Sequence, residues 1–142
     1  MRHLQATDMQ LFVHLTWRTQ NSRPLLGNDQ LRQAAFLAVK ARTRSHFCQV
    51  LAISATPCQM DMVASFPASL PITSLLRIAH EAAQEALVRL QRTMPGNFLE
   101  LPHYWEPGYT AHTLNAAEAA QAKAYLKACL QQRLTPPLPS NV

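Results

Sequence analysis

The chain has 142 residues and a formal net charge of +5, with 48% hydrophobic and 15% charged residues. This composition is typical of one globular domain with a real core and excludes an intrinsically disordered chain. No apolar run approaches the roughly 20 residues of a membrane helix, and the first residues lack a signal-peptide pattern. Three cysteines without C-x-x-C spacing favour reduced thiols, so we expect a cytoplasmic protein with no membrane contact.

The first half of the chain is expected to form a strand, a helix and two further strands. The first segment is rich in β-branched and aromatic residues, which is typical of a buried strand. Pro24 and Gly27 indicate a loop after it. Asn28 or Asp29 can cap a helix that runs to about Ser45. The expected strands are residues 9–19, 47–55 and 60–66.

The second half contains the clearest helical periodicity in the chain. Apolar residues recur at helical spacing from about Ile72 to Arg92, which predicts a long helix. Residues 98–104 are expected to be irregular or to form a short strand, and residues 109–113 are expected to form a fourth strand.

A final helix is predicted by a capping pair and an alanine-rich run. Asn115, followed three residues later by Glu118, suits the start of a helix that reaches about Gln132. The order β-α-β-β-α-β, followed by a helix, is that of a ferredoxin-like split βαβ antiparallel sheet, an α+β fold. We expect one domain over residues 1–134 and a disordered, proline-rich tail over residues 135–142. Many unrelated functions use this fold, so function has to be argued from particular residues.

Six short segments carry a family resemblance through their order and spacing. They are HLTWR at 14–18, RPLL at 23–26, MVASFP at 62–67, LPITSLL at 70–76, WEPGY at 105–109 and AYL at 124–126. Together they resemble the small single-tyrosine transposases of bacterial insertion sequences and their palindrome-associated relatives, the HUH class. The resemblance covers about residues 9–132. It implies a ferredoxin-like domain that forms a homodimer and binds single-stranded or hairpin DNA.

The resemblance also implies a chemical mechanism. In this family a tyrosine attacks a DNA phosphate, and a divalent cation held by two histidines polarises that phosphate. Tyr125 matches the tyrosine and is the expected catalytic residue. A phenol with a pKa of about 10 is a poor nucleophile until a neighbouring group activates it, and the charge that develops on the phosphate has to be neutralised.

The metal-binding positions depart from the family pattern. Gln59 and Asp61 replace the two histidines, and alternation along a strand still sends both side chains to one face. Their oxygens are hard ligands, so a site for Mg²⁺ or Mn²⁺ is one expectation. The alternative is a hydrogen-bonded Asp61 in an inactive site without a metal. Cys129 stands one turn after Tyr125, where the family commonly has a glutamine ligand, and His14 matches a first-strand histidine without an assigned role.

DNA contact is predicted at cationic and aromatic side chains. The candidates for phosphate contacts are Arg18, Arg23, Lys123 and Lys127. Tyr104 and Trp105, in a segment with Pro and Gly, are the candidates for stacking on unpaired bases, whereas Trp17 is expected in the core.

Three functions remain open from the sequence. The first is a transposase-like DNA-binding protein that recognises single-stranded or hairpin DNA with impaired catalysis, and the altered ligand positions favour it. The second is an active, metal-dependent transposase that nicks DNA and transfers the strand through a phosphotyrosine at Tyr125. The third is a ferredoxin-like regulatory or oligomerising domain that does not bind DNA.

Overall fold

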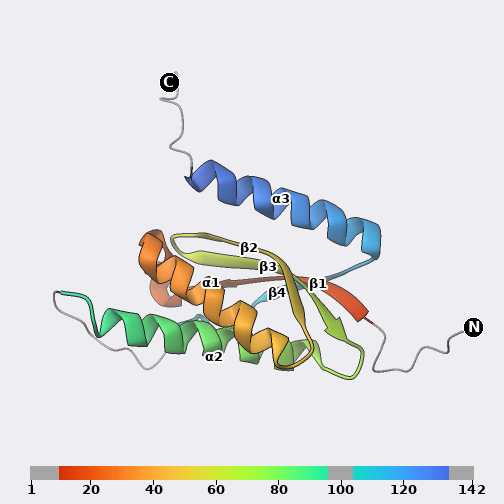
Figure 1. Cartoon of the computed structure of the whole chain (residues 1–142), viewed down its shortest axis with the longest axis horizontal. Coiled ribbons are helices and arrows are strands. Elements are labelled where there is room, and N and C mark those ends of the chain that lie inside the picture. The colour runs from red at the N-terminus through yellow and green to blue at the C-terminus, as the bar shows by residue number, and fades with distance from the viewer. Residues whose placement is uncertain (1–9, 96–103, 135–142) are drawn as a thin grey trace, which may run out of the picture.

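Within residues 10–95 and 104–134, which the computed structural model describes, the chain forms a four-stranded antiparallel sheet with helices on both faces (Figure 1). The strands, in the sheet order β2-β3-β1-β4, are β1 Gln10–Arg18, β2 Gln49–Thr56, β3 Gln59–Pro67 and β4 Thr110–Leu114. The helices are α1 Asp29–Arg44, α2 Ile72–Gln91 and α3 Ala116–Leu134. This order confirms the expected ferredoxin-like α+β fold with an additional helix. Most of the segment expected to be irregular (98–103) and the expected tail (135–142) lie outside the described residues.

Alternation along the central strand β1 separates two environments. Val13, Leu15 and Trp17 are buried in the main core, which α1 and α2 cover (Figure 1). Because successive side chains of a strand point to opposite faces, His14 and Thr16 lie on the face that α3 covers. Burial of each large apolar side chain contributes about 1.5–3 kcal/mol, so the side of α1 and α2 supplies most of the hydrophobic stabilisation.

Local sequence signals determine where α1 and α3 begin. The Asn28 side-chain oxygen accepts a hydrogen bond of 3.0 Å from the Leu31 backbone N–H, which makes Asn28 the N-cap of α1. The Asn115 side chain accepts a hydrogen bond of 2.8 Å from the Glu118 backbone N–H, and the Glu118 side chain accepts one of 2.9 Å from the Asn115 backbone N–H. This reciprocal arrangement is the capping box that the sequence predicts for α3.

Helix α3 covers its face of the sheet through a small apolar contact. Leu126 is buried against Ala52 of β2 and Val63 of β3, and Ala122 packs beside it, one turn earlier on the helix. This cluster is far smaller than the main core. The polar side chains on the same face are therefore only partly buried.

The strand boundaries differ from the expectation by one or two residues. β2 begins at Gln49 because Phe47 has a φ of 63° and a side chain that is 82% exposed. A positive φ at a bulky residue interrupts extended backbone, so the strand starts after it. β3 begins at Gln59 and β4 at Thr110, each one residue away from the expected start.

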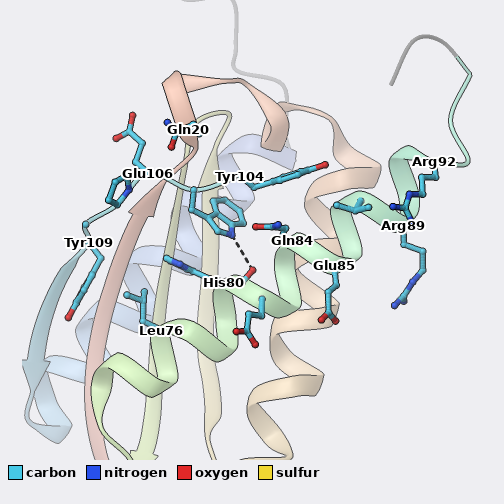
Figure 2. Close-up of a pocket in the computed structure, with 15 residues that line it drawn as sticks. Gln20, Leu76, His80, Gln84, Glu85, Arg89, Arg92, Tyr104, Glu106 and Tyr109 are labelled. Carbon is cyan, nitrogen blue, oxygen red and sulfur yellow. Dashed lines mark hydrogen bonds between the residues drawn. The ribbon is translucent and has the colours of Figure 1, made fainter. Parts of the chain in front are cut away.

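Backbone hydrogen bonds attach the segment before β4 to the end of β1. The Gln20 N–H donates to the Tyr104 carbonyl at 2.8 Å, and the Glu106 N–H donates to the Arg18 carbonyl at 3.0 Å. These bonds place residues 104–106 beside the end of β1, and the side chains of Tyr104 and Trp105 reach from there toward α2 (Figure 2).

Three aromatic rings join this segment to α2 and to the core. The His80 ring lies 5.0 Å from the Trp17 ring and 5.7 Å from the Trp105 ring, measured between centroids. The Trp105 indole N–H donates to the His80 carbonyl at 3.1 Å (Figure 2). Burial lowers the pKa of His80 to about 4, and its Nε2 has no hydrogen-bond partner among the described residues. His80 is therefore neutral in the folded protein near pH 7.

We expect His80 to make the fold sensitive to acid. The pKa of His80 is about 4 in the folded chain and 6.5 ordinarily, so the unfolded chain takes up this proton at a higher pH than the folded chain does. The stability of the folded protein that depends on a neutral His80 is therefore complete above pH 6.5 and is lost as the pH falls toward 4. The loss is on the order of 3 kcal/mol. Chemical denaturation at a series of pH values should show that His80→Phe flattens the dependence of the free energy of unfolding on pH. The control His46→Gln, at an exposed position, should keep the wild-type dependence. An unchanged slope in His80→Phe would contradict this assignment.

Candidate functional site beneath helix α3

The face of the sheet beneath α3 brings polar side chains from three strands together. Asp61 of β3 lies opposite Thr16 of β1, and His14 of β1 lies opposite His112 of the edge strand β4. Gln59, at the start of β3, shares the Asp61 face, as alternation predicts. The two predicted metal ligands are therefore neighbours.

The Asp61 carboxylate is held by hydrogen bonds from Gln59 on the same strand and from two residues of β1. One oxygen, Oδ1, accepts from the Thr16 hydroxyl at 2.6 Å and lies 3.0 Å from His14 Nε2. The other, Oδ2, accepts from the Gln59 side-chain amide at 3.1 Å. Both carboxylate oxygens thus already have protein partners.

These partners keep Asp61 ionised. Burial alone would raise its pKa, but the hydrogen bonds from His14, Thr16 and Gln59, with the charge interaction with His14, outweigh burial and lower the pKa below its usual value. The site therefore holds a negative charge at neutral pH. That charge is stabilised by donors that belong to the sheet itself.

This arrangement fits a metal ion poorly. Magnesium requires near-octahedral oxygen coordination, and Gln59 presents an amide N–H to Asp61. Among residues 10–95 and 104–134, no group of three or more His, Cys, Asp or Glu side chains is placed to hold a metal ion. The metal role of Gln59 and Asp61 stays a prediction, and the hydrogen bonds would have to rearrange to allow it.

Tyr125 projects from α3 into solvent, with 66% of its surface exposed. A hydrogen bond with Cys129, one turn further along the helix, is the main cause that raises its pKa, with smaller contributions from the charges of Cys129 and Asp61. The charge of Asp61 is the smallest of the causes that raise this pKa. A raised pKa makes the phenolate less available as a nucleophile.

The predicted phosphate contacts are not grouped around Tyr125. Arg18 is exposed and lies opposite Gln59 in the β1–β3 register, so it borders the cluster. Each helical residue turns by about 100°, which places Lys123 and Lys127 on the edge of α3 away from Tyr125. Arg23, half-buried after the first strand, is the fourth candidate.

The predicted stacking residues need a correction. Tyr104 and Trp105 are only 1% and 8% exposed, so their rings are not available as stacking platforms in this arrangement. Their place in a segment with Pro and Gly suggested exposure, but both rings pack into the main core. Tyr109, 43% exposed, is the accessible aromatic residue of this segment. As expected, Trp17 is a core residue.

Sequence reasoning missed the pairing of His14 and Thr16 with Asp61. These residues are 47 and 45 positions away from it in the chain. The available signal was alternation, which puts His14 and Thr16 on one face of β1. The pairing register of β1 with β3 was the missing information.

The fold is that of tyrosine transposases. A candidate transposase from Deinococcus radiodurans R1 superposes with a TM-score of 0.67 at 16% identity, over 91% of this chain and 98% of that chain. The REP-associated tyrosine transposase bound to a REP hairpin gives a TM-score of 0.62 at 15% identity, over 97% of this chain and 81% of that chain. No model of a protein family and no curated protein sequence matches the chain.

Helices long and apolar enough to cross a bilayer are absent from the described part of the chain.

We expect Asp61→Asn to lower the free energy of unfolding by about 1–3 kcal/mol at pH 7, because His14 and Thr16 lose an ionised acceptor. The folded pKa of Asp61 lies below its usual value of 3.8. The stabilisation is therefore present above that value and is lost as the pH falls through the folded pKa. Urea denaturation from pH 7 downward should show the difference shrinking below about pH 4. Glu81→Gln, at an exposed carboxylate, is the control, and an Asp61→Asn protein as stable as wild type at pH 7 would refute the role.

Replacing Cys129 should make Tyr125 easier to ionise. Cys129→Ala removes the hydrogen bond and the charge that raise the pKa of Tyr125, so that pKa should fall toward its usual value of 10. Nuclear magnetic resonance of ring-labelled tyrosine, followed against pH, would measure it. Cys58→Ala should leave the Tyr125 titration unchanged. An identical Tyr125 titration in Cys129→Ala and wild type would show that the thiol is not the cause.

Proposed function

We propose that this protein is a transposase-like DNA-binding protein that recognises single-stranded or hairpin DNA, with impaired catalysis, and that it works as a homodimer. The fold likeness to a transposase bound to a hairpin supports this class of ligand. The net charge of +5 is compatible with a polyanionic partner.

One observation carries the proposal of impaired catalysis. The Asp61 carboxylate, where a metal ligand is expected, uses both oxygens in hydrogen bonds with His14, Thr16 and Gln59. A divalent ion would have to displace these donors before it could neutralise charge on a phosphate. The raised pKa of Tyr125 works in the same direction, because it reduces the fraction of phenolate.

An active, metal-dependent transposase is the second candidate. The observation in its favour is that Tyr125 is largely exposed on α3, the helix that covers the sheet face carrying Asp61. In that case Gln59 and Asp61 would hold Mg²⁺ or Mn²⁺, and Tyr125 would form the covalent link to DNA.

Labelled hairpins with single-stranded flanks distinguish these functions. We expect salt-dependent binding, measured by fluorescence anisotropy, and no covalent adduct with Mg²⁺ or Mn²⁺. Arg18→Ala and Lys127→Ala should each weaken binding and reduce the salt slope by about 1. Lys40→Ala, on α1 at the opposite face, is the matched control.

Two outcomes would contradict the proposal. A metal-dependent adduct that is lost in Tyr125→Phe and in Asp61→Ala would establish the active transposase instead. Absence of salt-dependent affinity for any strand or hairpin would leave a regulatory or oligomerising domain that does not bind DNA.

A further inference from the structure

A large cavity lies on the opposite side of the sheet from the Asp61 cluster. It has a volume of about 1240 Å³ and lies between α2 and the segment from Tyr104 to Tyr109 (Figure 2). Small-molecule pockets commonly enclose about 300–1,000 Å³, so this cavity has room for more than one aromatic ring. The chemistry assigned above to α3 makes no use of it.

The cavity has an apolar and aromatic wall with amides beside it. Leu76 and His80 of α2 form part of the wall, together with the edges of Tyr104 and Trp105. Figure 2 shows Gln84 between the helix and the aromatic residues, where its amide can both donate and accept hydrogen bonds. A planar ligand with a polar edge matches these walls.

Charge is distributed unevenly along the cavity. Carboxylates come from Glu81 and Glu85 of α2 and from Glu106 of the facing segment, and guanidinium groups come from Arg89 and Arg92 near the end of α2. Glu85 is paired with Arg42, so Glu81 and Glu106 are the acceptors of interest. The rise of 1.5 Å per residue separates Glu81 from Arg89 by about 12 Å along the helix, a span of two or three nucleotides. The carboxylates of the lining disfavour phosphate beside them, and the guanidinium groups favour it.

The carboxylates of Glu81 and Glu106 also discriminate among bases. Adenine, guanine and cytosine carry exocyclic amino groups that donate to carboxylates, whereas the only ring donor of unpaired thymine is its N3–H, which is flanked by two carbonyl oxygens that repel a carboxylate. Tyr109 is 43% exposed and lines the cavity, so it offers a ring on which a base can stack.

We propose that this cavity is a second nucleic-acid site that binds unpaired bases with an exocyclic amino group in preference to thymine. The backbone of the same strand runs toward Arg89. The binding of a DNA strand in this cavity rests on the proposed function. The preference of the cavity among bases can be tested separately, with mononucleotides.

The first test uses mononucleotides as probes of the cavity. Titration with dAMP, dCMP and dGMP should shift the indole N–H resonance of Trp105, and dTMP should shift it at least about fivefold less at equal concentration. The backbone N–H resonance of Leu126, which is buried on the opposite face of the sheet, serves as the internal reference. Equal shifts with all four nucleotides, or none with any, would overturn the base preference.

The second test uses hairpins whose single-stranded flank is four A, C, G or T residues. We expect wild-type affinity for the T flank to be about tenfold lower than for the others. Glu106→Gln and Gln84→Leu should narrow this difference, while Glu118→Gln and Gln30→Leu, matched changes elsewhere, should preserve it. Equal affinity for all flanks, or an unchanged preference in both cavity variants, would overturn the inference and leave DNA binding intact.

Failure of the proposed function gives a different result. The hairpins would then not bind at all, and the mononucleotide shifts at Trp105 would decide the cavity separately. Shifts of the Trp105 resonance with dAMP, dCMP and dGMP would show that the cavity binds single nucleotides. The absence of these shifts would reject the cavity as a nucleotide site.

Discussion

Strand β1 is hydrogen-bonded on both sides, to β3 and to β4, and its alternation separates the two halves of the molecule. Val13, Leu15 and Trp17 anchor the core that α1 and α2 cover. Between them, His14 and Thr16 face α3 and bind the Asp61 carboxylate. The same nine-residue segment therefore supplies apolar area to one face and hydrogen-bond donors to the other.

The raised pKa of Tyr125 is one ground for the proposal of impaired catalysis. Activation of a phenol needs a nearby cation or base, and here the neighbouring charged group is the ionised Asp61. Cys129 acts in the same direction, because its hydrogen bond favours the protonated phenol. Two independent positions, on α3 and on β3, thus disfavour the phenolate.

Much of the fold could be predicted because its signals are local. The periodicity of α2, the capping pair of α3 and the apolar character of β1 depend on residues close together in the chain. Alternation also placed Gln59 and Asp61 on one face. The partners of Asp61 depend on the register between strands, which no short segment encodes. The burial of Trp105 depends likewise on His80 of a distant helix, so a Pro-Gly segment that suggested exposure was misleading.

The Asp61 cluster has a structural consequence that is separate from any ligand. A shift of one residue between β1 and β3 would turn His14 and Thr16 toward the opposite face and leave the Asp61 carboxylate without its donors. Such a misaligned sheet would carry an uncompensated, partly buried charge, at a cost of several kcal/mol. The cluster therefore helps to fix the register of β1 with β3. This contribution to correct folding does not depend on whether the protein cuts DNA.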